Sequence, residues 1–155
     1  MAVGEEKGCI GSNRADMGFF ADSLYVMEPD CAGGEGPRVV LRGIPCASED
    51  FVEVLPLEAY GYALTEGKTT DILAHTFSDI GVSCINVPAG YHNPHKDDEY
   101  TLIPELERCL AFVKQVVTTL HRRFPHEYRS ATQQRIMEPH RGSLTTMASC
   151  ISADR

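Results

Sequence analysis

The sequence predicts an α/β fold, in which helices pack on a mostly parallel or mixed sheet. Two observations lead to this prediction. Short apolar segments rich in strand-forming residues alternate along the chain with segments that carry helical signals. A long amphipathic segment, residues 103–120, has the spacing of a helix that covers such a sheet. The length of 155 residues is typical of one globular domain with its own core.

Three segments have the character of buried strands. Residues 23–27 (SLYVM) are mostly apolar, and we expect Pro29 to end this strand. Residues 38–42 (RVVLR) follow a turn that is rich in glycine. Residues 82–87 (VSCINV) form the third segment, which we expect to end at Pro88.

Helical signals lie between the second and third of these strands and again after the third. Ser48 offers an N-cap and two acids follow it, so we expect a helix from there to about Tyr60. A loop comes next, and a short helix is expected over residues 72–77. In the last and clearest helix, Pro104 stands in the first turn. Its apolar residues recur at three- and four-residue spacing, which predicts that they pack on the sheet: Ile103, Leu106, Leu110, Val113, Val117 and Leu120.

Charge and cysteine usage exclude several classes of function. The net charge of −8 opposes binding to nucleic acid, because phosphates would be repelled over most of the surface. The six cysteines contain no close pair, which fits neither a zinc ribbon nor a secreted disulfide scaffold, so we expect reduced core thiols. No segment approaches the about 18 apolar residues of a membrane span, and no signal peptide is recognisable. We therefore expect a soluble, cytoplasmic protein with neither a membrane nor a nucleic-acid partner.

The two ends of the chain differ in charge. From His121 onward there are six arginines and three acids, and apolar periodicity stops after Arg123. We therefore expect an ordered unit of residues 1–123 and a basic, poorly ordered tail of residues 124–155. Such a tail is either solvated or in contact with an acidic partner.

The segment GEEKGCIGS places two carboxylates, Glu5 and Glu6, side by side between glycines. Two ionised carboxylates held close together raise each other's pKa unless a cation offsets their charge. A metal ion removes that conflict, because one carboxylate can bind the ion while its neighbour takes a proton from an activated water. The alternative is a pair of solvated surface acids, which is the commoner case for adjacent glutamates.

The segment GYHNPHKDDEY follows the third predicted strand directly and contains His92 and His95. Pro94 between them disfavours a helix, so their spacing does not place both on one helical face. Loops at the carboxyl ends of strands are where open α/β sheets bind their ligands. The first predicted strand likewise ends on acids, Glu28 and Asp30, in the segment YVMEPDCAGG. Polar surface loops explain the same residues without a site.

Together the three segments resemble the second half of the catalytic domain of the zinc-dependent exopeptidases, the group that includes aminopeptidases, peptidase T and carboxypeptidase G-like enzymes. The resemblance implies that Glu5 is the general base and that Glu6, Asp30 and His95 are metal ligands. It also implies that Asp71, in the segment TTD, contacts the substrate or a metal ligand. Only 65 positions (95 minus 30) separate Asp30 from His95, too few for the lid domain of some members. The chain therefore resembles the lidless, aminopeptidase-type branch.

The resemblance also implies a fold, an activity and partners. Residues 1–123 would form the C-terminal half of a three-layer α/β/α domain, incomplete at its N-terminal side. The activity would be hydrolysis of small peptides by a water that two zinc ions activate, with manganese or cobalt as alternative metals. The family's upstream His-x-Asp motif and bridging aspartate have no counterpart before Glu5. Activity is therefore expected in an intact or complemented enzyme, through self-association or pairing with a chain that supplies the N-terminal half.

Two further interpretations stay open at this point. One is a catalytically inert fragment or pseudoenzyme that acts as a binding module, which the absent upstream ligands favour. The other is hydrolysis of a non-peptide amide by the same residues.

Overall fold

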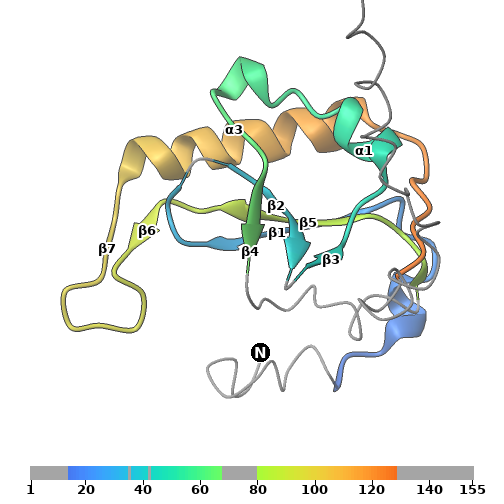
Figure 1. Ribbon diagram of the computed structural model, residues 1–155, viewed down its shortest axis with the longest axis horizontal. Helices are drawn as coiled ribbons and strands as arrows, with labels where there is room; N and C mark the ends of the chain where they lie inside the picture. The colour runs from blue at the N-terminus through green and yellow to red at the C-terminus, as the bar shows by residue number, and fades with distance from the viewer. Residues whose placement is uncertain (1–13, 35, 42, 68–79, 129–155) are drawn as a thin grey trace, which may run out of the picture.

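The computed structural model describes residues 14–34, 36–41, 43–67 and 80–128, and within them a mixed β-sheet forms the centre of the molecule (Figure 1). The strand order is β1–β5–β2–β3, and β4 pairs with β2 as well. These strands are β1 (Val26–Cys31), β2 (Arg38–Leu41), β3 (Ile44–Pro45), β4 (Thr65–Gly67) and β5 (Cys84–Pro88). With helices packed on this sheet, the predicted α/β class is confirmed.

The sheet combines parallel and antiparallel pairs. β1 runs parallel to β5 and β4 runs parallel to β2, whereas β2 is antiparallel to both β3 and β5. β5 is followed by a small separate sheet in which β6 (Tyr91–His92) pairs with β7 (Tyr100–Thr101). Within the described ranges, no helix has the length and apolar character to cross a membrane.

Two of the three predicted strands, residues 38–42 and 82–87, agree with β2 and β5 to within about two residues. The prediction that Pro29 ends the first strand is wrong, because β1 continues through Pro29 to Cys31. The reason is local: the pairing of β1 with β5 shifts register between Glu28 and Cys31, so Pro29 lies where a regular ladder bond is not made. Its side chain is exposed.

The predicted helix from Ser48 to Tyr60 is only partly correct. α1 (Glu49–Glu53) begins as expected, with the Ser48 hydroxyl accepting a hydrogen bond from the Phe51 N–H at 3.3 Å. The helix then ends, because Pro56 lacks an N–H and disfavours helical backbone at the residue before it. A separate 3₁₀ turn, η4 (Glu58–Tyr60), follows. The helix predicted over residues 72–77 lies outside the described residues.

The longest helix, α3 (Ile103–Thr119), agrees with the predicted position, but most of the face predicted to pack on the sheet is wrong, since of that stripe Val113 and Leu120 contact the core. Its buried residues are Cys109, Phe112 and Val116. Four members of the predicted stripe are exposed instead: Ile103 (60%), Leu106 (42%), Leu110 (66%) and Val117 (50%). The helix therefore carries two apolar stripes about 100° apart, and the one with Phe112 faces the sheet.

The core lies on both faces of β5. On one face Ile85 and Val87 pack against Phe51 of α1, Phe112 of α3 and Phe124. Figure 1 shows α1 and α3 on this same side of the sheet. The other face has a second cluster that Met17 and Phe20 of η3 (Met17–Phe20) partly cover: Cys46, Ile80, Val82 and Cys84. β5 is consequently buried on both sides, as a central strand of an α/β sheet should be.

The chain after α3 continues along the edge of this core. The Phe124 side chain is 1% exposed, and Pro125 forms an isolated bridge with Val82. The Tyr128 hydroxyl donates a hydrogen bond to the Cys46 carbonyl at 3.1 Å. The four cysteines in the described ranges are free and buried, which confirms the prediction of reduced core thiols for them: Cys31, Cys46, Cys84 and Cys109.

Candidate functional site

Two segments that the sequence singled out lie at one edge of the sheet. Asp30 stands one residue before the end of β1, and the segment with His95 follows β5. Because β1 and β5 are parallel neighbours, the chain leaves both strands in the same direction. The parallel register is therefore what brings the acidic segment and the histidine segment together across more than 50 residues of sequence.

Hydrogen bonds hold these two segments against each other beyond the strands. The Ala89 N–H donates to the Cys31 carbonyl at 2.9 Å, and the Gly33 N–H donates to the Tyr91 carbonyl at 2.7 Å. The Tyr91 hydroxyl donates to the Asp30 carbonyl at 3.4 Å. The backbone around Asp30 is thus fixed by the segment that leads to His95.

His95 lies in the turn between β6 and β7, and local side chains stabilise that turn. Asn93 and His95 have φ angles of 55° and 63°, in the left-handed region that side chains other than glycine rarely adopt. The Asn93 amide donates to the Asp98 carboxylate at 2.9 Å, and the His95 N–H donates to the Glu99 carboxylate at 2.7 Å. The histidine ring is exposed, so its position on the turn leaves it accessible to a ligand.

The other histidine of this segment, His92, contacts residues that link the hairpin to α3. The His92 Nε2 lies 3.0 Å from the Glu105 carboxylate in the first turn of α3, and its ring stacks on Tyr100 with centroids 5.1 Å apart. Both members of the His92–Glu105 pair are about three-quarters buried. Gly33 packs directly against this pair. His92 therefore joins the hairpin to α3, which leaves His95 as the candidate ligand.

A buried polar contact that the sequence analysis missed lies beside Asp30. Asn86 on β5 is fully buried, and its amide donates to the Glu28 carboxylate at 2.7 Å and, at 3.4 Å, to the Asp30 carbonyl. Its Oδ1 atom is buried with no hydrogen-bond partner among the described residues. Arg38 stands opposite Asn86 on the next strand. The only signal in the sequence is one asparagine inside the mostly apolar segment VSCINV.

Burial controls the ionisation of two further groups near Asp30. Burial raises the pKa of the Tyr91 hydroxyl to about 12, the Asp30 carboxylate adds to this, and the Arg38 guanidinium opposes it. Burial also raises the pKa of the Cys31 thiol to about 12, again with Arg38 opposing. At neutral pH Tyr91 is therefore a hydrogen-bond donor, and Cys31 is neither a thiolate ligand nor a nucleophile.

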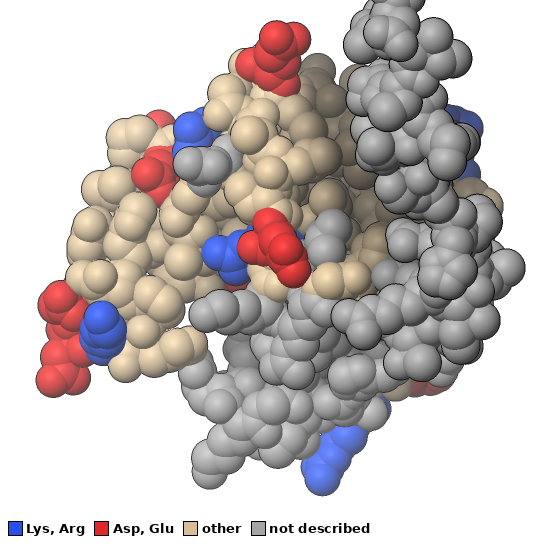
Figure 2. All heavy atoms as spheres, in the orientation of Figure 1, with Lys and Arg blue, Asp and Glu red and all other residues tan. Residues whose placement is uncertain are grey.

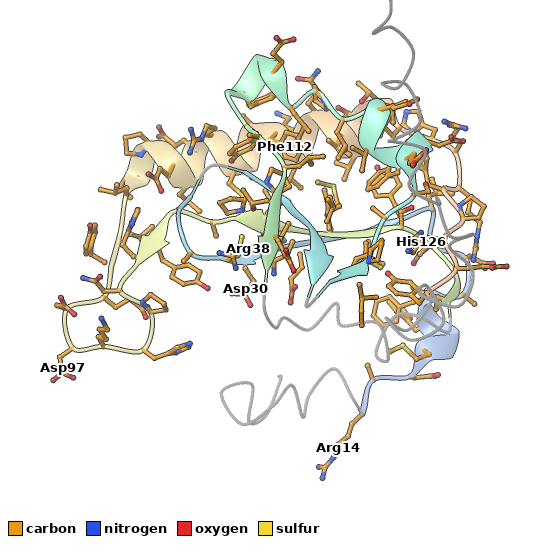
Figure 3. All side chains as sticks on the ribbon, in the orientation of Figure 1. Arg14, Asp30, Arg38, Asp97, Phe112 and His126 are labelled. Atoms are coloured by element: carbon orange, nitrogen blue, oxygen red, sulfur yellow. The ribbon has the colours of Figure 1, made fainter. Side chains whose placement is uncertain are left out.

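The views of the side chains show how these groups are distributed. Figure 3 shows Asp30 and Arg38 at the sheet, whereas Asp97 lies at the outer tip of the β6–β7 loop. Figure 2 shows acidic and basic side chains together at that tip and again near the centre of this face. The tip itself is exposed and carries Lys96, Asp97 and Asp98.

The donor types at this edge suit a metal, but the described residues do not complete a site. A carboxylate such as Asp30 and an imidazole such as His95 are the oxygen and nitrogen ligands that zinc, manganese and cobalt accept. Within the described ranges no group of three or more His, Cys, Asp or Glu side chains is arranged to hold a metal ion. The predicted residues Glu5, Glu6 and Asp71 lie outside the described residues. A three-ligand centre therefore needs ligands from outside the described residues.

Comparisons of the chain with models of known protein families, with curated proteins and with solved structures gave no match. The resemblance to the zinc-dependent exopeptidases consequently rests on three motifs: GEEKGCIGS, YVMEPDCAGG and GYHNPHKDDEY. What those motifs imply about activity and cofactors is a matter for proposal and experiment.

Proposed function

We propose that this protein carries out metal-dependent hydrolysis of peptide bonds, as an aminopeptidase-like exopeptidase that acts on small peptides. One observation carries the proposal: Asp30 and the segment of His95 leave two parallel neighbouring strands at the same edge and are joined by hydrogen bonds. That edge is the usual ligand-binding edge of an open α/β sheet. Both side chains are exposed, as metal ligands that must also meet a substrate need to be.

Three residues would hold the metals in this proposal. Glu6 and His95 supply a carboxylate and an imidazole to one ion, and Asp30 supplies a carboxylate to the other, so each ion needs further ligands to reach the three that a catalytic zinc site normally has. Zinc at these residues, with manganese or cobalt as alternatives, would supply a Lewis acid that lowers the pKa of a bound water to near neutral. The family to which the motifs point uses two zinc ions.

Glu5 would carry the protons in the reaction. As the neighbour in sequence of the metal ligand Glu6, it would accept a proton from the activated water and then donate that proton to the leaving amine. The positive charge of the metal favours ionised carboxylates and so offsets the repulsion between the two glutamates. Asp71 would contact the substrate or one of the ligands. The division into a base and a ligand requires that Glu5 and Glu6 are not interchangeable.

The fold and location belong to the same proposal. We propose the three-layer α/β/α arrangement for the intact domain, since the described sheet has α1 and α3 on one face and η3 on the other. We also propose that a second chain, or a second copy, supplies the remaining ligands of the two-metal centre. A cytoplasmic location is supported by the free thiols of the described cysteines.

Zinc binding is the first test. The chain is stripped with a chelator and titrated with zinc in a calorimeter, together with His95→Ala and, as a matched control, His121→Ala. His121 is also an exposed histidine but lies beyond α3, away from the proposed centre. We expect zinc binding that is lost in His95→Ala and retained in His121→Ala. Equal binding in both variants would overturn the proposed ligand set, and no binding by the isolated chain would mean that a second chain must supply the remaining ligands.

Hydrolysis is the second test. The zinc-loaded chain is assayed on a panel of dipeptides, with Glu5→Gln compared with Glu53→Gln, which alters an exposed glutamate at the end of α1. Loss of a general base lowers kcat by about 10²- to 10⁴-fold, so Glu5→Gln should lose hydrolysis but keep zinc binding. Zinc binding without hydrolysis, alone or with a chain that supplies the missing ligands, would favour the alternative of an inert binding module. That alternative draws support from the incomplete ligand set among the described residues.

A further inference from the structure

α3 has a continuous apolar stripe, most of which the other described residues leave exposed. The stripe consists of Ile103, Leu106, Leu110, Val113 and Val117, and Leu120 follows at the end of the helix. Val113 and Leu120 are half-buried, and the exposed fractions of the other four side chains range from 42% to 66%. The helix packs on the sheet through Cys109, Phe112 and Val116. Within the stripe, Val113 and Leu120 also contact that core, whereas the other four residues are exposed.

The spacing of the stripe is that of a coiled-coil seam. The intervals between successive members are 3, 4, 3, 4 and 3 residues, which is the alternation of a and d positions in a heptad repeat. A helix of 17 residues presents this seam over about 26 Å. Apolar residues at these positions pack against the same positions of a second helix. A second copy of the chain would supply such a helix.

We propose that the α3 stripe is the interface of a homodimer, in which two copies of α3 pair in antiparallel orientation about a two-fold axis. In this register Ile103 lies opposite Leu120 of the second copy, Leu106 opposite Val117, and Leu110 opposite Val113. Each pair brings an a position to a d position, so every member of the stripe is used. The interface is self-complementary, as two-fold symmetry requires.

The charges beside the stripe fit the same register. With Ile103 and Leu110 at a positions, Glu107 and Lys114 are both e positions, and both are exposed. Antiparallel helices place the e positions of one copy beside those of the other, so Glu107 meets Lys114 of the second copy, and the symmetry repeats the pair. Within one helix the two residues are seven apart, too far to pair with each other. Opposite charges at these positions therefore favour a second copy over an unrelated partner.

The first experiment measures association of the full chain by sedimentation velocity. A seam of one helix per copy is a small interface, so the measurement covers protein concentrations from about 1 to about 200 µM. Leu110→Glu places a charge at the centre of the seam. Its matched control, Ala111→Glu, introduces the same side chain at the next exposed position, outside the seam. We expect a dimer for the wild-type chain and for Ala111→Glu, and a monomer for Leu110→Glu.

The second experiment tests the register. Reversal of one charge, Glu107→Lys or Lys114→Glu, creates two like-charged pairs and should weaken the dimer about tenfold. The double variant restores both opposite pairs and should recover the wild-type dissociation constant. A chain that is monomeric at all concentrations, or a dimer that Leu110→Glu leaves intact, overturns the proposal. Single reversals that the double variant does not rescue overturn the antiparallel register. Neither experiment depends on metal binding or hydrolysis, so the dimer proposal can be tested independently of the proposed function.

Discussion

Gly90 is a position at which one methyl group should have a large effect on stability. It follows β5 at the start of the histidine segment, has a φ angle of +83°, and accepts a hydrogen bond from the Leu102 N–H at 2.8 Å through its carbonyl. A Cβ built on Gly90 lies 2.8 Å from the Leu106 backbone nitrogen and 2.8 Å from the Glu105 Cβ. The absence of a side chain therefore lets the segment after β5 approach the first turn of α3 closely.

The expected loss of unfolding free energy in Gly90→Ala is the sum of two costs. A side chain in the left-handed backbone region costs about 1 to 2 kcal/mol. The contacts with α3 add an overpacking cost of about 1 to 3 kcal/mol, because a backbone atom of a packed helix cannot move aside as a flexible side chain can. The total reduction in the free energy of unfolding is about 2 to 5 kcal/mol.

Gly81→Ala separates these two costs. Gly81 has a φ angle of +63°, but a Cβ there meets no atom within 4 Å, so its substitution carries the backbone cost alone. Urea unfolding at low protein concentration, followed by circular dichroism, gives the free energy of unfolding of both variants. We expect Gly90→Ala to lose about 1 to 3 kcal/mol more than Gly81→Ala. Equal losses in the two variants would refute the close approach of this segment to α3.

Three other predictions concern the core, the candidate site and the buried thiols. Phe112→Ala should lower the free energy of unfolding by about 3 to 5 kcal/mol and Phe19→Ala by about 0.5 kcal/mol, because Phe112 is fully buried and Phe19 is 82% exposed; similar urea midpoints would contradict the assignment of the buried face. Gly33→Ala should cost about 1 kcal/mol more than Gly34→Ala in the same assay, because a Cβ on Gly33 meets the Glu105 carboxylate and lies 2.6 Å from the His92 ring, whereas on Gly34 the nearest atom is 3.8 Å away. Burial raises the pKa of Cys31 and Cys84 to about 12, so only the unfolded chain ionises these thiols above about pH 9, and stability should fall between pH 9 and 12. The loss is about 1 to 2 kcal/mol per thiol at pH 10, and the slope of stability against pH should decrease in Cys84→Ala; an unchanged slope would speak against burial as its cause.

The elements that the sequence predicted well are those whose signals are local. Pro104 and the apolar period placed α3 to within a residue or two, and Ser48 marked the start of α1 through its hydroxyl. The apolar run of β5 was recognisable because a strand buried on both faces needs no polar side chain for solvent. Each of these signals depends on residues within a few positions of one another.

The predictions that failed depend on contacts between distant segments. α3 has two apolar stripes, and the stripe with Phe112 faces the sheet. The ring of Phe112 contacts the ring of Tyr62 at a centroid distance of 5.2 Å, and the sequence of the helix alone does not indicate that contact. Pro29 stays inside β1 because the pairing with β5 is irregular at that point. Strand β4 was not predicted, since its three residues carry too short a pattern.

In the candidate site, too, some residues can be predicted from local motifs and others cannot. Asp30 and His95 could be chosen from motifs, but Asn86 could not, because its role comes from its position opposite Glu28 in a parallel register that joins segments 58 residues apart. A fully buried amide that donates to one carboxylate and to the carbonyl of the next acid fixes the end of β1. A metal ligand at Asp30 needs such fixing, since ligands held by supporting hydrogen bonds bind metals more tightly. If Asp30 binds the metal, Asn86→Leu should weaken zinc binding although Asn86 is no ligand, and Ser48→Ala, which alters a polar group supporting α1, should not.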